Sequence, residues 1–310
     1  MLPTRVLGQT GLNVTQLGYG SMGLRGPKTW GVRVVGDADA ERVLNAVLDL
    51  GINFIDTAPD YGLSEERIGR SIGHRRQEFV LATKCGCDYR QADDHLEMTH
   101  TWTKEVIQRN LELSLKRLQT DFIDIYQFHG GTAETLQKNG LIELLQSFRD
   151  QGVIHQIGVS SSLPELPALI KLDLFDTFQI PYSCLAPQHG DLMQQAADRG
   201  AGIIVRGGIA HGGPDAKIQR DALNQVWTTA RLDELLPEGV NRAELILRYT
   251  LTHPACHTAI VGTCDLQHLR ENTHVAARGS LSPELFAEIS TRVQQAQLQL
   301  RAITGATTPS

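Results

Sequence analysis

Four polar side chains of this sequence stand at or just beyond the ends of largely apolar runs, and their types could together carry out proton transfer. Asp56, Lys84 and His129 each directly follow such a run, and Tyr61 lies five residues beyond Asp56. The runs cover residues 52–55, 79–83 and 122–128. A charged side chain at the end of a buried strand is costly unless a partner compensates it, so these positions indicate a shared polar site.

An acid–base role for Tyr61 follows from its type and from its expected neighbours. A tyrosine has an unperturbed pKa of about 10, which is too high for efficient proton exchange near neutrality. A lysine ammonium held close lowers that pKa, and an aspartate beside the lysine keeps the lysine charged and oriented. A histidine could hydrogen-bond the substrate oxygen or share the proton. The set suits delivery of a proton to a carbonyl oxygen while a hydride reaches the carbon from a cofactor.

The apolar pattern of the chain predicts the elements that would position this set. Eight strand-like segments alternate with segments of helical periodicity, which indicates parallel strands joined by helical crossovers. The strands are expected at residues 16–21, 52–55, 79–83, 122–128, 154–160, 177–180, 202–205 and 257–261. The helices are expected at residues 37–50, 64–72, 103–118, 134–151, 164–172, 188–199, 220–236, 242–252, 266–277 and 283–301.

A closed (β/α)8 TIM barrel is the α/β architecture that fits this alternation, as a single domain over residues 1–310. An N-terminal β-hairpin of residues 5–7 and 14–17 would precede the barrel, and extra C-terminal helices would end in a frayed tail at 305–310. A doubly wound open sheet is the alternative, since residues 18–23 match the spacing Gly-x-Gly-x-x-Gly. That match runs into a long glycine-rich loop and not into a helix, so the barrel is preferred.

The barrel would bring the four polar side chains together. In this architecture the residues that do chemistry lie at the carboxyl ends of the strands and in the loops that follow. Asp56, Lys84 and His129 end the second, third and fourth strands, which are neighbours in a singly wound barrel. Taken singly, each has an ordinary explanation as a cap, a solvated charge or a packing residue. The prediction of an active site depends on their falling on three consecutive strand ends.

Composition narrows the class of protein further. The chain of 310 residues has 41% hydrophobic and 21% charged residues, which is typical of folded soluble proteins. A formal net charge of −6 argues against nucleic acid as a partner, and no apolar run is long enough to span a bilayer. The N-terminus lacks the apolar core of a secretory signal, and five scattered cysteines do not suggest a disulfide framework. A cytoplasmic protein without nucleic-acid or membrane partners is expected, and its oligomeric state is not indicated.

Residues 85–102 form a long segment with two features of interest. Cys85, Cys87, His95 and His100 raise the question of a metal site, but Cys-x-Cys lacks the usual spacing of zinc ligands, so no metal is expected. The segment is interpreted as a loop that forms a wall of the active site. Candidate substrate contacts on this and other loops, which would suit a hydrophobic or aromatic carbonyl compound, are Met22, Trp30, Tyr89, Trp102 and Trp227.

Three segments resemble the signatures of the aldo-keto reductase superfamily, at residues 51–69, 115–129 and 260–272. The first holds Gly-Ile-Asn-Phe-Ile-Asp-Thr-Ala followed by Tyr-Gly, and the second ends at the histidine of the fourth strand. The resemblance implies a (β/α)8 barrel that reduces carbonyl groups with NAD(P)H. It assigns a catalytic tetrad of Tyr61, Lys84, Asp56 and His129.

The same resemblance implies contacts to the nicotinamide end of the cofactor. Ser161 stands where asparagine is usual beside the carboxamide, and Arg206 stands where many members stack an aromatic ring on the nicotinamide. A guanidinium plane can also stack or contact a pyrophosphate, and glycines let the backbone approach phosphates closely. The implied contacts are Ser160, Ser161, Gln179, Arg206, Gly207 and Gly208.

Contacts to the adenosine end are implied near the last strand and the helix after it. Free amides at a helix start suit a phosphate. His268 stands where an arginine usually holds the 2′-phosphate of NADPH, and Asp265 adds negative charge nearby. NADPH is the expected cofactor, with NADH as the alternative. The implied contacts are Gly262, Thr263, Cys264, His268, Glu271 and Asn272.

Two other functions compete with a small-molecule carbonyl reductase. A regulatory or binding subunit could keep the reductase barrel, as potassium-channel beta subunits resemble it. A barrel isomerase or lyase acting on a phosphorylated substrate would not need the pair Ser160 and Gln179. The intact tetrad favours the reductase.

Overall fold

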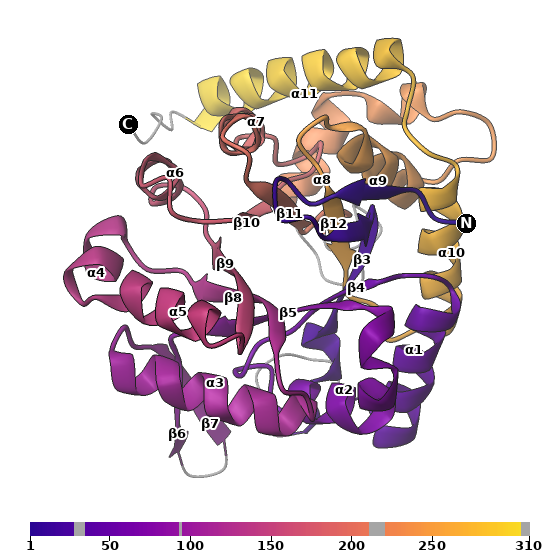
Figure 1. The fold of residues 1–310 in the computed structure, drawn as a ribbon. Coiled ribbons are helices and arrows are strands. Elements are labelled where there is room, and N and C mark those ends of the chain that lie inside the picture. Colours follow the sequence, from indigo (N-terminus) through magenta and orange to yellow (C-terminus); the bar gives the residue numbers. More distant parts are fainter. Residues whose placement is uncertain (28–34, 93–94, 211–220, 305–310) are drawn as a thin grey trace.

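The computed structural model describes residues 1–27, 35–92, 95–210 and 221–304. Eight of the described strands, all parallel, close into a barrel that runs in chain order around the ring (Figure 1). The closed ring confirms the predicted (β/α)8 architecture and excludes the doubly wound sheet. The barrel strands are β3 (Leu17–Gly20), β4 (Phe54–Asp56), β5 (Val80–Cys85), β8 (Ile123–His129), β9 (Ile154–Ser160), β10 (Thr177–Pro181), β11 (Gly202–Arg206) and β12 (Thr258–Val261).

Helices surround this ring and follow the predicted order. Their apolar faces pack onto the strands, while the polar faces remain outside. None of the described helices combines the length and the apolar character that crossing a membrane requires. The α-helices are α1 (Asp37–Asp49), α2 (Ser64–Ile72), α3 (Lys104–Leu118), α4 (Ala133–Lys138), α5 (Leu141–Asp150), α6 (Leu166–Lys171), α7 (Gly190–Asp198), α8 (Asp221–Thr229), α9 (Arg242–Thr252), α10 (Leu266–Ala277) and α11 (Pro283–Thr304). Short 3₁₀ turns are η1 (Ser21–Leu24), η2 (Gly73–Glu78) and η3 (Leu232–Leu235).

The N-terminal hairpin covers one end of the barrel. Strands β1 (Thr4–Val6) and β2 (Asn13–Thr15) pair antiparallel, as predicted. Leu7, directly after β1, is fully buried and packs with Phe54 and Ile204 in an apolar cluster. This cluster lies at the amino end of the barrel, where the backbone of Gly202 begins β11 beside Leu7. The carboxyl ends of the strands are therefore left for chemistry.

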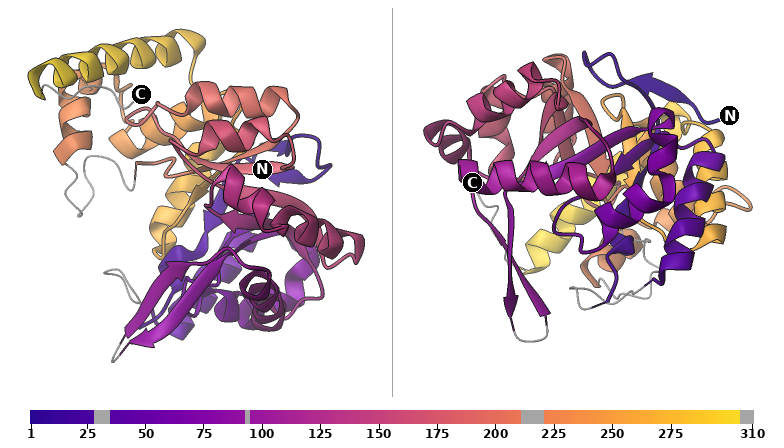
Figure 2. Two further views of the ribbon diagram at one scale, coloured as in Figure 1. Left: turned by 90° about the vertical axis from the view of Figure 1, so that its left-hand side faces the viewer. Right: turned by 60° about the horizontal axis from the view of Figure 1, so that its bottom comes forward.

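The segment after β5 differs from the expected loop. It forms an antiparallel hairpin of β6 (Cys87–Ala92) and β7 (His95–His100), which projects from the barrel in Figure 2. The prediction of a loop at 85–102 is therefore wrong. The alternating pattern of this segment is mostly polar, so it does not show the apolar alternation by which a half-buried strand is usually found.

Two predicted helices are divided in the structure. The helix expected at 134–151 consists of α4 and α5, because Gly140 between them has a positive φ of 61° that a continuous helix does not allow. The helix expected at 220–236 consists of α8 and the short turn η3. The predicted C-terminal helices are confirmed, with α11 packing against α8 and η3, and the tail at 305–310 lies outside the described residues.

Gly86 fixes the turn from the barrel into the β6–β7 hairpin. Its φ is +80°, and a Cβ atom added there would lie 2.0 Å from Trp102. Gly152 offers a matched control, because its φ is +74° but nothing lies within 4 Å of such an atom. We expect Gly152→Ala to lower the free energy of unfolding by roughly 1–2 kcal/mol through backbone strain. Gly86→Ala should lower the free energy of unfolding by the same strain and by roughly 1–3 kcal/mol more, because the added methyl group overpacks against Trp102.

Urea unfolding of the two variants measures this difference. Equal losses for Gly86→Ala and Gly152→Ala would show that Trp102 does not pack on the Gly86 backbone.

Candidate active site

A buried ion pair lies at the carboxyl ends of β4 and β5. Asp56 and Lys84 are both fully buried, and Lys84 Nζ donates to Asp56 Oδ1 at 2.9 Å and to Oδ2 at 2.8 Å. Lys84 Nζ also donates a hydrogen bond to the carbonyl oxygen of Thr57 at 2.8 Å. Burial lowers the pKa of Lys84, but the charge of Asp56 and its hydrogen bonds to the ammonium act in the opposite direction, and the net shift is upward. Lys84 is therefore a permanent, oriented cation.

Two glutamines, one on β8 and one on β10, extend the hydrogen bonding of this pair. Gln127 Nε2 and Gln179 Nε2 both donate to Asp56 Oδ1, at 3.2 and 2.7 Å. Gln179 Oε1 in turn accepts from Ser160 Oγ at 2.9 Å. Of the predicted carboxamide-binding residues, Gln179 is thus hydrogen-bonded to the carboxylate that holds Lys84, and Ser160 is linked to that carboxylate through Gln179. Hydrogen bonds of this kind hold side chains in one arrangement, although Gln127 Oε1 is buried without a partner among the described residues.

Tyr61 lies over the ion pair. It is 8% exposed, and Lys84 Nζ is 5.0 Å from the centroid of its ring. Burial of the ring raises the pKa of Tyr61 to about 12, while the charge of Lys84 acts in the opposite direction. The sequence analysis predicted that Lys84 lowers this pKa. Its contribution has that sign, but burial outweighs it, so Tyr61 is protonated at neutral pH.

His129 lies edge-on to Tyr61, with ring centroids 6.2 Å apart and an interplanar angle of 82°. Burial is the main reason that the pKa of His129 lies well below its usual range. The positive charges of Lys84, His100 and Arg206 lower it further. A neutral imidazole at neutral pH follows. The structure thus brings Asp56, Lys84, Tyr61 and His129 to one side of the barrel rim, as predicted.

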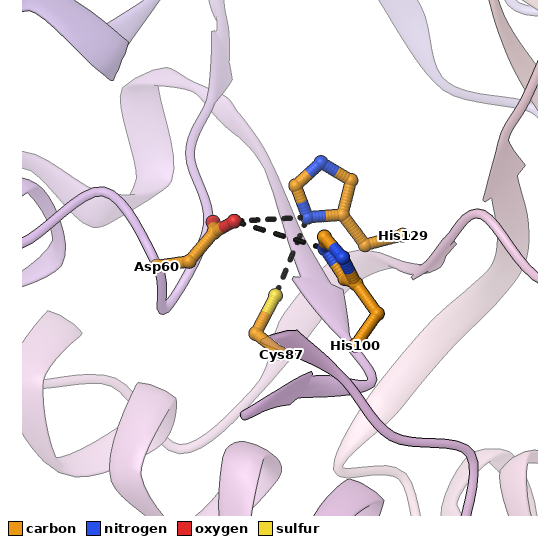
Figure 3. Close-up of side chains that lie close together, drawn as sticks. All are labelled: Asp60, Cys87, His100 and His129. Carbon is orange, nitrogen blue, oxygen red and sulfur yellow. Dashed lines mark hydrogen bonds and ion pairs between the residues drawn. The ribbon is translucent and has the colours of Figure 1, made fainter. Parts of the chain in front are cut away.

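Three further residues surround His129 that the sequence analysis did not name as catalytic or binding residues, although it placed the segment of Cys87 and His100 at the wall of the site (Figure 3). Its Nδ1 lies 3.4 Å from Asp60 Oδ2 and 3.3 Å from Cys87 Sγ. The ring of His100 stands edge-on to it, with centroids 4.7 Å apart. Asp60 immediately precedes Tyr61, and this position was the one sequence signal that pointed to it.

Arg206 ends β11, at the predicted nicotinamide end of the site. Burial lowers the pKa of this half-buried guanidinium and the negative charge of Asp56 acts in the opposite direction, so Arg206 lies within electrostatic reach of the buried ion pair. Ser161 is buried, and its amide donates to the carbonyl oxygen of Gln179 at 3.0 Å. Gly207 has a positive φ of 70°, and the carbonyl oxygen of Gly208 accepts from Thr250 Oγ1 at 2.7 Å.

The start of α10 forms the expected adenosine end, with one difference. Asp265 Oδ1 accepts from the backbone amides of Gln267 at 2.7 Å and His268 at 3.1 Å. The bond from the His268 amide, and after it the bond from the Gln267 amide, hold the pKa of Asp265 below its usual range. The amides expected to meet a phosphate are therefore already capped by a carboxylate. Glu271 is exposed and accepts from Gln267 at 2.8 Å.

A hollow of about 370 Å³ lies beside this helix start and includes a cation from another helix. Arg42 of α1 lines it together with Cys264 and Gln267, and pairs with Asp39 one turn away. Around it, Gly262 and Thr263 lead into the helix, His268 is exposed, and Asn272 is partly buried. Arg42 was not predicted, because nothing in the local sequence ties α1 to α10.

The residues present fit a nicotinamide dinucleotide. At one end a hydroxyl and a carboxamide, on Ser160 and Gln179, meet beside the tetrad. At the other end a hollow with a cation opens at a helix start. Hydroxyl, amide and guanidinium groups are the donors that a carboxamide and phosphates require.

The candidate substrate contacts have different outcomes. Trp102 is partly buried, stacks on His100 with centroids 6.1 Å apart and meets Phe128 edge-on at 6.2 Å. Met22 in η1 is 38% exposed. Trp227 is 1% exposed and packs in the core on α8, with Arg242 over its ring, so the structure gives it a packing role. Trp30 and the side chain of Tyr89 lie outside what the structure describes.

The barrel, the tetrad and the capped helix start define a class of protein. The model of the aldo/keto reductase family matches residues 16–293, and the chain belongs to this family of oxidoreductases. The sequence is 29% identical to "Uncharacterized oxidoreductase YqkF" of Bacillus subtilis (strain 168), over 94% of this chain and 96% of the relative. It is 26% identical to "NADH-specific methylglyoxal reductase" of Escherichia coli (strain K12), over 71% of this chain and 73% of the relative.

A solved structure of an aldo-keto reductase is also similar to this chain over nearly its whole length. The holo form of aldo-keto reductase AKR11C1 from Bacillus halodurans superposes with a TM-score of 0.80 at 29% identity, covering 96% of each chain.

Proposed function

We propose that this protein reduces aldehyde or ketone carbonyls to alcohols with NAD(P)H, with Tyr61 as the proton donor. The observation that carries the proposal is the buried Lys84, held by both oxygens of Asp56 and lying 5.0 Å from the Tyr61 ring. A protonated phenol beside a fixed cation is a general acid whose conjugate base is stabilised as it forms. When bound, the nicotinamide would supply the hydride.

Each residue of the tetrad has a separate task in this proposal. Tyr61 donates its phenolic proton to the substrate oxygen, and Lys84 stabilises the phenolate left behind. Asp56 holds Lys84 in place, since both oxygens of its carboxylate accept hydrogen bonds from the ammonium group. Neutral His129 orients the carbonyl oxygen. Trp102 provides an apolar wall, which suits a hydrophobic or aromatic carbonyl compound.

The reaction is tested by following NADPH absorbance with a broad panel of aldehydes and ketones. Turnover of part of this panel is expected. An absence of turnover across the whole panel would overturn the enzymatic function and favour a binding role for the barrel.

NADPH is the proposed cofactor, with NADH accepted less well. Arg42 supports this preference, because among the described residues it is the cation that lines the hollow at the start of α10. Asp265 opposes it, since its carboxylate caps the amides that a 2′-phosphate would otherwise meet. His268, Glu271 and the Gly262 backbone would complete the adenosine contacts. The opposing charges of Arg42 and Asp265 predict a modest preference.

Arg42→Ala tests this assignment. Loss of a charge-assisted contact to the 2′-phosphate should raise KM for NADPH about 10-fold or more. The KM for NADH should not change, because NADH carries no phosphate there, and NADH therefore serves as the control in the same variant. Steady-state kinetics with both cofactors measures the effect. Equal changes for the two cofactors would contradict the role given to Arg42.

A further inference from the structure

Asp60, Cys87, His100 and His129 form a compact group of possible metal ligands beside the tetrad (Figure 3). They come from three segments of the chain: the turn after β4, the β6–β7 hairpin and the end of β8. Cys87 and His100 face each other as register partners at the base of the hairpin. One possible ligand atom of each residue lies within 4.8 Å of those of the others.

Three of the distances between these atoms are equal or close to those of a tetrahedral metal site. Zinc bonds of about 2.0–2.3 Å at tetrahedral angles place neighbouring ligand atoms about 3.3–3.7 Å apart. His129 Nδ1 lies 3.3 Å from Cys87 Sγ and 3.4 Å from Asp60 Oδ2. His100 Nε2 lies 3.8 Å from Asp60 Oδ2. Small side-chain adjustments would therefore bring all four atoms to bonding distance.

The chemistry of the four ligands also favours one metal. A thiolate with two imidazoles and a carboxylate is a set that zinc binds in proteins, whereas magnesium and calcium prefer oxygen ligands. A thiolate and a carboxylate carry two negative charges, which balance those of Zn²⁺. The nearby Lys84 has its own counter-ion in Asp56, so its charge is compensated separately.

Asp60 gives independent evidence that a cation belongs here. Its side chain is 6% exposed, and its carboxylate faces the two imidazoles. Among the described residues, its Oδ1 atom is buried without a hydrogen-bond partner. A buried carboxylate oxygen without a partner is costly, and a metal ion would compensate that cost.

We propose that Asp60, Cys87, His100 and His129 bind one Zn²⁺ ion. The ion joins the β6–β7 hairpin to the barrel rim, because two ligands come from the hairpin and two from the rim. The sequence analysis expected no metal, since it considered Cys85 and Cys87 as a local pair. The ligands that actually approach one another come from distant segments, and Cys85 is not among them.

The surroundings hold the ligands in place and leave an entry path. Trp102 stacks on the His100 ring with an interplanar angle of 14°. Asn110 Nδ2 donates to the carbonyl oxygen of Cys87 at 2.8 Å, which fixes the start of the hairpin. His100 is 40% exposed, so an ion can reach the site from solvent. Ordered neighbours of this kind orient metal ligands and raise affinity.

Titration of the metal-free protein with Co²⁺ and Zn²⁺ tests the proposal. Co²⁺ should give a thiolate charge-transfer band and intense visible bands typical of four-coordination, with one ion per chain, and Zn²⁺ should displace it. Hydrogen exchange of the β6 and β7 amides should slow when Zn²⁺ binds. None of these readouts needs a substrate, so they can fail while the carbonyl reductase proposal stands.

Matched variants identify the ligands. Cys87→Ala should abolish the charge-transfer band, and His100→Ala should weaken Zn²⁺ binding by more than the about 10–100-fold typical of losing an outer partner. Cys85→Ala, close in sequence to Cys87 but outside the group, should bind as the wild type does. Because His100 is exposed, its variant stays interpretable even if Cys87→Ala does not fold. Unchanged binding by His100→Ala, or no stoichiometric binding by the wild type, would overturn the proposal.

Discussion

Replacing Tyr61 with phenylalanine is expected to lower kcat by about 10²–10⁴-fold, the range that a general acid contributes. The variant keeps the buried ring over Lys84 and loses only the hydroxyl that gives the proton. Because the pKa of Tyr61 is raised to about 12, the wild-type hydroxyl is protonated throughout the neutral range. Single-turnover measurements with NADPH and a responsive aldehyde would report the loss on the chemical step.

Tyr126→Phe is the matched control for this experiment. Tyr126 is also buried, on the neighbouring strand β8, but its hydroxyl donates to the carbonyl oxygen of Ile107 at 3.0 Å, among residues of α3. Its removal should cost roughly 1 kcal/mol of stability and leave kcat unchanged. Affinity for NADPH should be unchanged in both variants. Turnover by Tyr61→Phe equal to that of the wild type would remove Tyr61 from the proposed mechanism.

Asp56→Asn should produce the largest loss of stability. Lys84 is fully buried and Asp56 is its counter-ion at 2.8 and 2.9 Å, so the substitution leaves a buried ammonium without a paired charge. Removing one partner of a buried ion pair typically costs about 3–5 kcal/mol. Chemical denaturation should show this loss, and kcat should fall as well, because Lys84 is no longer held as a cation beside Tyr61.

The double variant Asp56→Asn/Lys84→Met separates the two effects. A neutral pair of similar volume removes the uncompensated charge, and such replacements often recover stability. The asparagine carbonyl oxygen can still accept from Gln127 and Gln179, so the network towards Ser160 is kept. We expect stability close to the wild type and activity as low as in Asp56→Asn. A double variant as unstable as the single one would show that the ion pair is not what the single substitution disrupts.

The predicted architecture and the tetrad rest on short-range information. Apolar runs alternating with helical periodicity specify a parallel barrel, because each helix must return the chain to the same end of the sheet. The carboxyl ends of all strands then meet at one rim, so Asp56, Lys84 and His129 could be placed together from their positions alone. Ser160 and Gln179 were assigned through the family resemblance instead; Ser160 ends β9, and Gln179 lies within β10.

Other features depended on contacts that local sequence does not encode. The β6–β7 hairpin is mostly polar, and its position is fixed by the packing of Trp102 on Gly86 and by the hydrogen bond from Asn110. Arg42 reaches the adenosine end only because α1 lies against α10. The position of Gly140 divided a helix whose apolar periodicity is continuous.

The sequence by itself determined which residues stand at the rim of the barrel and therefore which chemistry is available there. Only the tertiary structure decided how far each of them is buried and therefore in which direction its pKa shifts. Burial of Tyr61 depends on every segment that covers it, so the sign of its net pKa shift could not be derived from Lys84 alone. The grouping of Asp60, Cys87 and His100 around His129 likewise requires three segments to meet, and side chains so far apart in sequence become neighbours only through packing.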